Sequence, residues 1–188
     1  MNFKDLDRIE IRFAGAGGQG LVLASFILAE AMMMTGYNII QGESHGIEAR
    51  GGISIGELIA SKGEIYDLIV KEPNIFITIS QESCNKHYKN IFPDALVITD
   101  SSLVKNIPAD INSKNIFTIP FYQAITEKLG TSLPINIATL GTLAELTNIV
   151  TPQSVKDAIT NIVPKESNEI NIRAFDIGMD LAKNRNKN

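Results

Sequence analysis

A glycine-rich segment between two apolar runs constrains the fold of this chain more than any other feature. Residues Gly15 to Gly20 read Gly-Ala-Gly-Gly-Gln-Gly, follow an alternating apolar run at 9–13, and precede an apolar run at 21–34. This order predicts a strand, a tight turn and a helix, which together present backbone N–H groups and a helix N-terminus to an anion. The glycines also match the G-x-G-x-x-G spacing of dinucleotide sites. That match alone is weak evidence, and tight strand–helix packing or a protein-facing role is the favoured alternative.

Strand-like and helix-like segments alternate along the rest of the chain. We therefore expect a single domain over residues 1–188, with a Rossmann-like, three-layer α/β fold, a largely parallel sheet and a β-hairpin excursion. We place the hairpin at 53–60 and 65–70, joined by a turn at 61–64. The other predicted strands are 9–13, 37–41, 74–80, 95–100 and 116–120, and the predicted helices are 21–34, 82–90, 122–129, 136–148 and one beginning at Thr151-Pro152.

Composition narrows the classes of function. The formal net charge of −4, the absence of Trp and an aromatic content of 6% argue against nucleic-acid binding. Cys84 is the only cysteine, so an internal disulfide is excluded, an iron–sulfur cluster or metal site held by this chain is not expected, and a reducing, cytoplasmic location is the default. The first residues are too polar for a signal peptide, and the run at 21–34 is too short to span a membrane.

A second glycine-rich segment, Gly42 to Gly52, carries most of the charged candidates for a site. His45 suits acid–base chemistry, although hydrogen bonding within a loop is the commoner role of such a residue. Arg50 suits bidentate binding of a carboxylate or phosphate, and an ion pair with Glu43 or Glu48 that fixes the loop is an equal alternative. Glu43 is also the only acidic residue placed to hold the ribose of a dinucleotide.

No complete catalytic set follows from the sequence. Cys84 and His87 lie three residues apart on a predicted helix, but nothing nearby supplies an orienting partner for a Cys–His pair. Asp100 ends a predicted strand, where a capping or turn role is more common than catalysis. We therefore assign no catalytic residue, and expect a subunit that completes an active site built on other chains.

The two glycine motifs, in this order, resemble those of gamma subunits of 2-oxoacid:ferredoxin oxidoreductases. The likeness covers nearly the whole chain. It is strongest in the strand–turn–helix start and in the Glu-x-Arg-Gly-Gly segment. That segment reads Glu-Ala-Arg-Gly-Gly here, and together with Ser-Gln-Glu after the next strand it looks more like the 2-oxoglutarate type than the pyruvate type. The matching segments are 11–20, 44–52, 73–74, 80–82, 136–141 and 171–178.

The resemblance implies a function that the residues alone do not give. Enzymes of this family decarboxylate a 2-oxoacid oxidatively with thiamine diphosphate, Mg²⁺ and coenzyme A, and pass electrons through iron–sulfur clusters to ferredoxin. The gamma chain would hold none of these cofactors alone, would assemble with alpha, beta and ferredoxin-like delta subunits, and would self-associate when isolated. Its implied contacts with coenzyme A or a partner chain are Gly15, Gly17, Gly18, Gln19, Gly20, Ser44, His45, Glu48, Arg50, Gly51 and Gly52. The alternatives are a stand-alone nucleotide-binding oxidoreductase, or specificity for pyruvate or branched-chain oxoacids.

Overall fold

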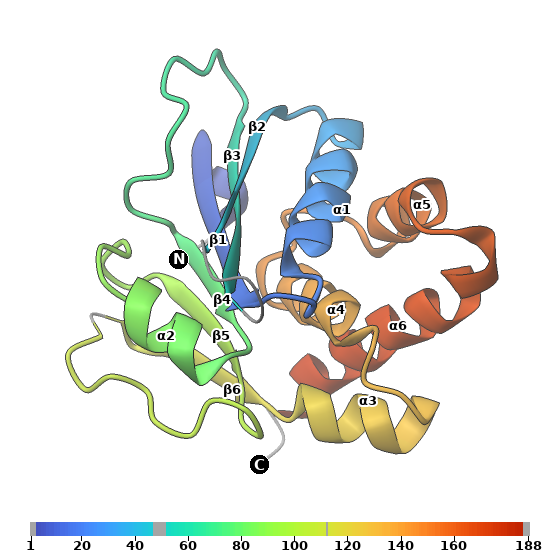
Figure 1. The fold of residues 1–188 in the computed structure, drawn as a ribbon. Helices are drawn as coiled ribbons and strands as arrows, with labels where there is room; N and C mark the ends of the chain where they lie inside the picture. Colours follow the sequence, from blue (N-terminus) through green and yellow to red (C-terminus); the bar gives the residue numbers. More distant parts are fainter. Residues whose placement is uncertain (1–2, 47–51, 112, 186–188) are drawn as a thin grey trace.

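The computed structural model describes residues 3–46, 52–111 and 113–185 and contains a mixed sheet flanked by helices (Figure 1). Its six strands lie in the order β2-β3-β1-β4-β5-β6. The strands are β1 (Arg8–Ala16), β2 (Asn38–His45), β3 (Ile53–Ser61), β4 (Ile75–Thr78), β5 (Leu96–Asp100) and β6 (Asn115–Ile119). The helices are η1 (Phe3–Asp5), α1 (Leu21–Met34), α2 (Gln81–His87), α3 (Phe121–Leu129), α4 (Ile135–Thr147), α5 (Pro152–Ile162), η2 (Lys165–Ser167) and α6 (Asn168–Arg185).

The sheet is parallel apart from β3. Strand β1 pairs in parallel with β4, β4 with β5 and β5 with β6, whereas β3 runs antiparallel to both β1 and β2. The predicted α/β class with a largely parallel sheet is therefore confirmed. Because β1, β4, β5 and β6 run in the same direction, their carboxyl ends meet at one edge, where loops leading to α1, α2 and α3 begin.

The hairpin is present, but its strands are not the ones that the sequence predicted. Strand β3 pairs with β2, with Asn38 opposite Ser61 and His45 opposite Ser54. Residues 65–70, the predicted partner of β3, form no strand and lie in the connection from β3 to β4. Their apolar side chains Tyr66, Leu68 and Ile69 are largely exposed, so these residues have neither a strand partner nor a core contact that would hold them in a sheet.

Charged residues on β1 explain how that connection is held. Strand β1 alternates, with Ile9, Ile11 and Phe13 in the main core and Arg8, Glu10 and Arg12 on the opposite face. Glu10 Oε2 accepts the backbone N–H groups of residues 71 and 72, at 2.9 and 3.2 Å, and Arg12 donates to the carbonyl of residue 70. The chain therefore crosses β1 as a loop held by side chains, and no crossover helix is required because β3 and β4 run in opposite directions.

The main core lies between the sheet and a layer formed by α1, α3, α4, α5 and α6, and a smaller core lies on the other face, next to α2 (Figure 1). Helix α1 has the predicted bounds, and Thr151 Oγ1 caps α5 by accepting the N–H of Ser154 at 3.0 Å. The prediction did not include α6. This helix packs very closely on α4, since a Cβ added to Gly178 would lie 2.0 Å from the Ala138 carbonyl oxygen.

Candidate functional site

The glycine turn lies at the carboxyl edge of the sheet, between the end of β1 and the start of α1. Gly20 precedes α1 with a φ of 73°, and no side chain caps the helix in the described part of the chain. The side-chain amide of Asn136, in the first turn of α4, donates to the Gly20 carbonyl at 2.9 Å. A side chain at Gly20 would meet that amide at 2.7 Å, so both the backbone conformation and the contact require glycine there.

Gln19 fills the first half of the turn. Its Oε1 accepts the N–H of Ala16 at 2.7 Å, and its Nε2 donates to the Ile79 carbonyl at 3.1 Å. The carboxamide thus links the carboxyl ends of the neighbouring strands β1 and β4. An added Cβ at Gly15 would lie 2.7 Å from Gln19 Oε1, so this glycine makes room for the link. The contacts of Gln19 and Gly15 described here serve packing, and a ligand contact for these two residues stays a prediction.

The structure brings the two glycine segments together. The N–H of Gly17 donates to the carbonyl of Gly52 at 2.7 Å, and Gly15 lies opposite Ser54 in the β1–β3 ladder. At Gly18, with a φ of 88°, an added Cβ would meet none of the described residues within 4 Å beyond its two chain neighbours. The predicted residues Glu48, Arg50 and Gly51 lie outside the described residues.

Residues 42–45 belong to β2, so the predicted loop over 42–52 begins later than expected. All four are exposed, as is Gly46, where the strand ends. His45 lies with Nδ1 3.2 Å from Ser54 Oγ and Nε2 3.8 Å from Glu43 Oε1. The contact with Ser54 joins β2 to β3, and the contact with Glu43 lies within β2. Together they hold the imidazole at the end of the hairpin that lies at the carboxyl edge of the sheet, where Ser44 also lies. They fit a hydrogen-bonded His better than a buried acid–base group.

Two cavities flank the second half of the glycine turn. One, of about 240 Å³, is bounded by Gly20, Asn136 and the segment from 163 to 171, and its lining is mostly apolar. The other, of about 180 Å³, is bounded by Gly18, Gln19, Tyr122 and residues 132–135. Leu133 lines both cavities. The sequence argument assigned no role to Asn136, Tyr122 or Leu133, although the meeting of parallel strand ends was a signal that helix starts would gather here.

Asp100 fixes the far side of this edge. Its carboxylate is fully buried and accepts backbone N–H groups from Ser102 and Leu103, at 2.6 and 2.9 Å, and from Tyr122 at 2.6 Å. It therefore closes the turn after β5 and caps α3. The predicted capping and turn role of Asp100 is confirmed.

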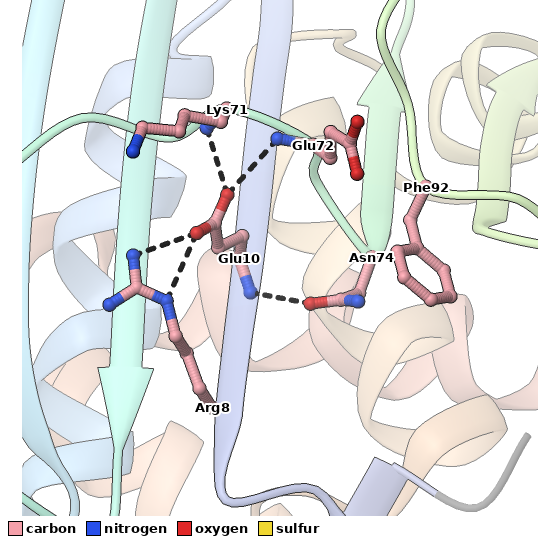
Figure 2. Close-up of a pocket in the computed structure, with 6 residues that line it drawn as sticks. All are labelled: Arg8, Glu10, Lys71, Glu72, Asn74 and Phe92. Carbon is pink, nitrogen blue, oxygen red and sulfur yellow. Dashed lines mark hydrogen bonds and ion pairs between the residues drawn. The ribbon is translucent and has the colours of Figure 1, made fainter. Parts of the chain in front are cut away.

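A larger cavity, of about 360 Å³, lies at the opposite, amino-terminal edge (Figure 2). Within it Arg8 donates twice to Glu10 Oε1, and Asn74 Oδ1 accepts the backbone N–H of Glu10 at 2.8 Å. Figure 2 shows one oxygen of Glu10 bound by Arg8 and the other by the backbone N–H groups of Lys71 and Glu72. This network holds the β3–β4 connection.

The candidate pair on α2 has altered proton affinities but no catalytic geometry. Burial raises the pKa of the Cys84 thiol, which disfavours the reactive thiolate. Burial also lowers the pKa of His87, with smaller effects in the same direction from Arg12 and Lys86, against Glu57. Within residues 3–46, 52–111 and 113–185, no group of three or more His, Cys, Asp or Glu side chains is placed to hold a metal ion. No helix of the described chain is long and apolar enough to cross a membrane.

The strand order disfavours a dinucleotide site. In such a site, the acidic residue at the end of the second strand lies beside the glycine turn, because the two strands are neighbours. Here β3 lies between β2 and β1, so Glu43 is separated from the turn by a whole strand. Glu43 faces Gly56 across the ladder and approaches His45.

Comparison with known proteins identifies relatives. The family model described as pyruvate ferredoxin/flavodoxin oxidoreductase matches residues 10–181. The 2-oxoglutarate synthase subunit KorC of Methanocaldococcus jannaschii is 36% identical over 94% of this chain and 95% of its own length. The crystal structure of a keto/oxoacid ferredoxin oxidoreductase gamma subunit from Geobacter sulfurreducens has a TM-score of 0.81 and 33% identity, covering 93% of this chain and 98% of that one.

A longer solved protein contains the same fold. A 2-oxoglutarate:ferredoxin oxidoreductase from Magnetococcus marinus, with 2-oxoglutarate, coenzyme A and succinyl-CoA bound, has a TM-score of 0.82 and 24% identity to this chain. The match covers 95% of this chain but 32% of that one. The fold described here therefore also occurs as about a third of a larger polypeptide.

Proposed function

The chain belongs to the pyruvate ferredoxin/flavodoxin oxidoreductase family, and we propose that it is the gamma subunit of a 2-oxoglutarate:ferredoxin oxidoreductase. The complex would convert 2-oxoglutarate and coenzyme A into succinyl-CoA and CO₂, passing two electrons to ferredoxin. The similarity to 2-oxoglutarate synthase subunits along almost their full length is the observation that carries this proposal. We treat residues 1–188 as one gamma-type domain.

A supporting rather than catalytic role fits the residues at the carboxyl edge. Asp100 is fully engaged with backbone N–H groups, Gln19 links two strands, and the exposed His45 approaches a serine and a glutamate of its own hairpin. Ser54 lies beside His45, but the imidazole is exposed and its contact with Glu43, at 3.8 Å, is too long for an orienting hydrogen bond, so we assign no nucleophile–base pair to the described residues of this edge. The thiamine diphosphate, Mg²⁺ and iron–sulfur clusters of the complex would be held by alpha, beta and delta subunits in the cytoplasm.

Coenzyme A is the ligand that we propose for this chain's own surface. The uncapped N-terminus of α1 and the exposed turn at Gly18 are suited to a phosphate group. The mostly apolar cavity beside Gly20 offers room for a less polar part of the same molecule. This combination fits an amphipathic anion. The Gly17–Gly52 hydrogen bond joins the glycine turn before α1 to the 42–52 segment, so both segments border the proposed site.

The function is tested by producing the chain anaerobically with the subunits encoded beside it and assaying ferredoxin reduction with several 2-oxoacids. We expect activity that requires coenzyme A and is highest with 2-oxoglutarate. Higher activity with pyruvate or a branched-chain oxoacid would show that the complex has the alternative substrate specificity. A chain that purifies alone and binds a nicotinamide or flavin nucleotide would refute the subunit assignment.

The coenzyme A contact is tested separately with Arg50→Ala in the assembled complex. Loss of a charge-assisted hydrogen bond should raise the KM for coenzyme A by about 10- to 100-fold and leave the KM for 2-oxoglutarate unchanged. Lys71→Ala is the matched control, because Lys71 is an exposed cation at the opposite edge of the sheet. Equal KM values in the two variants would show that Arg50 does not bind coenzyme A.

A further inference from the structure

Helix α1 presents an apolar stripe that the described residues of the chain do not cover. Its inner side is buried against the sheet and α5, whereas Leu23, Phe26, Met33 and Met34 are between 38% and 59% exposed. These four side chains and Glu30 lie on one face of the helix, since a step of 100° per residue places all five within about a third of a turn. We call this face the α1 seam.

The spacing of the seam indicates what kind of element covers it. Leu23, Phe26, Glu30 and Met33 follow one another at intervals of three, four and three residues. This is the a/d spacing with which one helix packs along another. Met34 widens the stripe at its C-terminal end. A groove-shaped or flat partner surface would not require this repeat, whereas a helix lying along α1 would.

Charge specifies the partner further. Glu30 is the only charged residue in α1, and the last turn of the helix has no basic residue to complement its partial negative charge. The side-chain amide of Asn161 donates a long hydrogen bond to Glu30 Oε1, at 3.4 Å. A carboxylate in the middle of an apolar contact is stable only if the partner supplies a cation.

We propose that the α1 seam binds a helix of another subunit of the complex, whose apolar side chains flank one Lys or Arg that pairs with Glu30. The inference rests on the proposed function, because it takes the chain to be a subunit. A second copy of the chain fits less well. Its α1 has no Lys or Arg, so a helix pair formed by two copies would bury both Glu30 side chains without a cation.

Site-directed cross-linking of the assembled complex tests the occupant. The only native cysteine is buried, so Met33→Cys places a single accessible thiol on the seam. After labelling with a thiol-directed photo-cross-linker, which needs no amine on the partner, we expect this chain to join a helical segment of a larger subunit. Leu68→Cys, at an exposed apolar residue of the β3–β4 connection, is the control for random collision. Cross-links only to a second copy, none at all, or equal yields from both variants would each overturn the proposal.

Binding measurements test the energetics. We expect Phe26→Ala to weaken association with the partner subunits by about 30-fold, as for a central aromatic residue of an interface. Ile69→Ala, an equally apolar exposed control, should change association less than about 2-fold. Glu30→Lys should weaken association more than Glu30→Gln. Replacing the Lys or Arg of the cross-linked partner helix by Glu should restore association of the Glu30→Lys variant. An unchanged affinity for Phe26→Ala, with the fold confirmed by urea unfolding, would overturn the proposal.

The same preparations separate the two hypotheses. Ferredoxin reduction by the wild-type complex reports on the proposed function, whereas variant assembly reports on the seam. If wild type assembles but has no 2-oxoacid-dependent activity, the proposed function fails and the seam can still stand. If wild type is active and the seam variants assemble normally, only the seam proposal fails.

Discussion

Removal of the Asp100 carboxylate should unfold the carboxyl edge more than any other single polar substitution there. The side chain is fully buried at the end of β5 and accepts three backbone N–H groups. Two belong to the turn after β5, and the third begins α3, whose own N-cap, Pro120, makes no side-chain hydrogen bond. One carboxylate therefore holds the turn, the strand end and the helix start in register.

The magnitude follows from the number of hydrogen bonds. A hydrogen bond to a charged group contributes about 1.5–3 kcal/mol, and a buried donor left unpaired costs about 1–3 kcal/mol. In Asp100→Ala all three donors lose their acceptor, but water can reach the exposed Tyr122 end, so we expect a loss of about 3–6 kcal/mol in the free energy of unfolding. In Asp100→Asn the remaining oxygen still accepts two donors, and the loss should be about 1–3 kcal/mol.

Urea unfolding of the isolated chain, followed by far-UV circular dichroism, measures both losses against wild type. Asp110→Asn is the matched control, since this exposed carboxylate accepts one hydrogen bond, from Tyr88 at 2.9 Å, and its loss should cost less than about 1 kcal/mol. If Asp100→Ala costs no more than this control, or if the Asn variant is as unstable as the Ala variant, the three hydrogen bonds do not hold the edge as argued.

Three further outcomes test other contacts. Gly178→Ala should lower the free energy of unfolding by about 3 kcal/mol in urea unfolding, because its Cβ would lie 2.0 Å from the carbonyl oxygen of Ala138. Gln19→Ala should cost about 1–3 kcal/mol, and amide exchange should show faster exchange at Ala16, whose N–H loses its acceptor. The pKa of His87 is lower in the folded chain than in the unfolded chain. As the pH falls through about 6.5, the unfolded chain therefore takes up the imidazole proton before the folded chain does, and the free energy of unfolding of wild type should decrease toward about pH 5.5. His87→Gln should reduce that decrease in urea unfolding measured at about pH 5.5 and about pH 7.5, and an equal decrease in both proteins would contradict it.

Local patterns in the sequence were sufficient to predict most of the helices and strands. Helix α1 occurs with its predicted bounds because a mostly apolar run, with Ser25 and Glu30 its only polar residues, follows a glycine in the left-handed conformation and ends before Gly36. The strands β4, β5 and β6 lie within two residues of their predicted limits.

The hairpin partner was predicted wrongly because two segments compete for β3 in the sequence. Residues 65–70 alternate like a strand, yet β3 pairs with β2 on one side and β1 on the other, which leaves no free edge for them. The signal for this arrangement was on β1. A central strand with charged residues at every second position, as at Arg8, Glu10 and Arg12, indicates a face that no crossover helix covers.

Helix α6 was missed for a different reason. Its sequence is polar over much of its length and contains Gly178, which lowers helix propensity. What stabilises it is a contact between distant parts of the chain: Thr142 Oγ1 in α4 donates to the Gly178 carbonyl at 2.8 Å, and the absence of side chains at Gly141 and Gly178 lets the two backbones approach. No local pattern reports such a contact.

The glycine turn shows why its motif alone cannot distinguish packing from binding, since the backbone contacts differ between its two halves. In the first half, the N–H groups of Ala16 and Gly17 already have acceptors, in Gln19 and in the distant Gly52. In the second half, Gly18 is open and α1 starts without a side-chain cap beside two cavities. Substitutions in the first half should therefore act on stability alone, and a substitution at Gly20 should do so too, because its conformation and its contact with Asn136 require glycine. An effect on coenzyme A affinity is expected at Gly18, where an added side chain meets no described atom and only the positive φ of 88° adds strain.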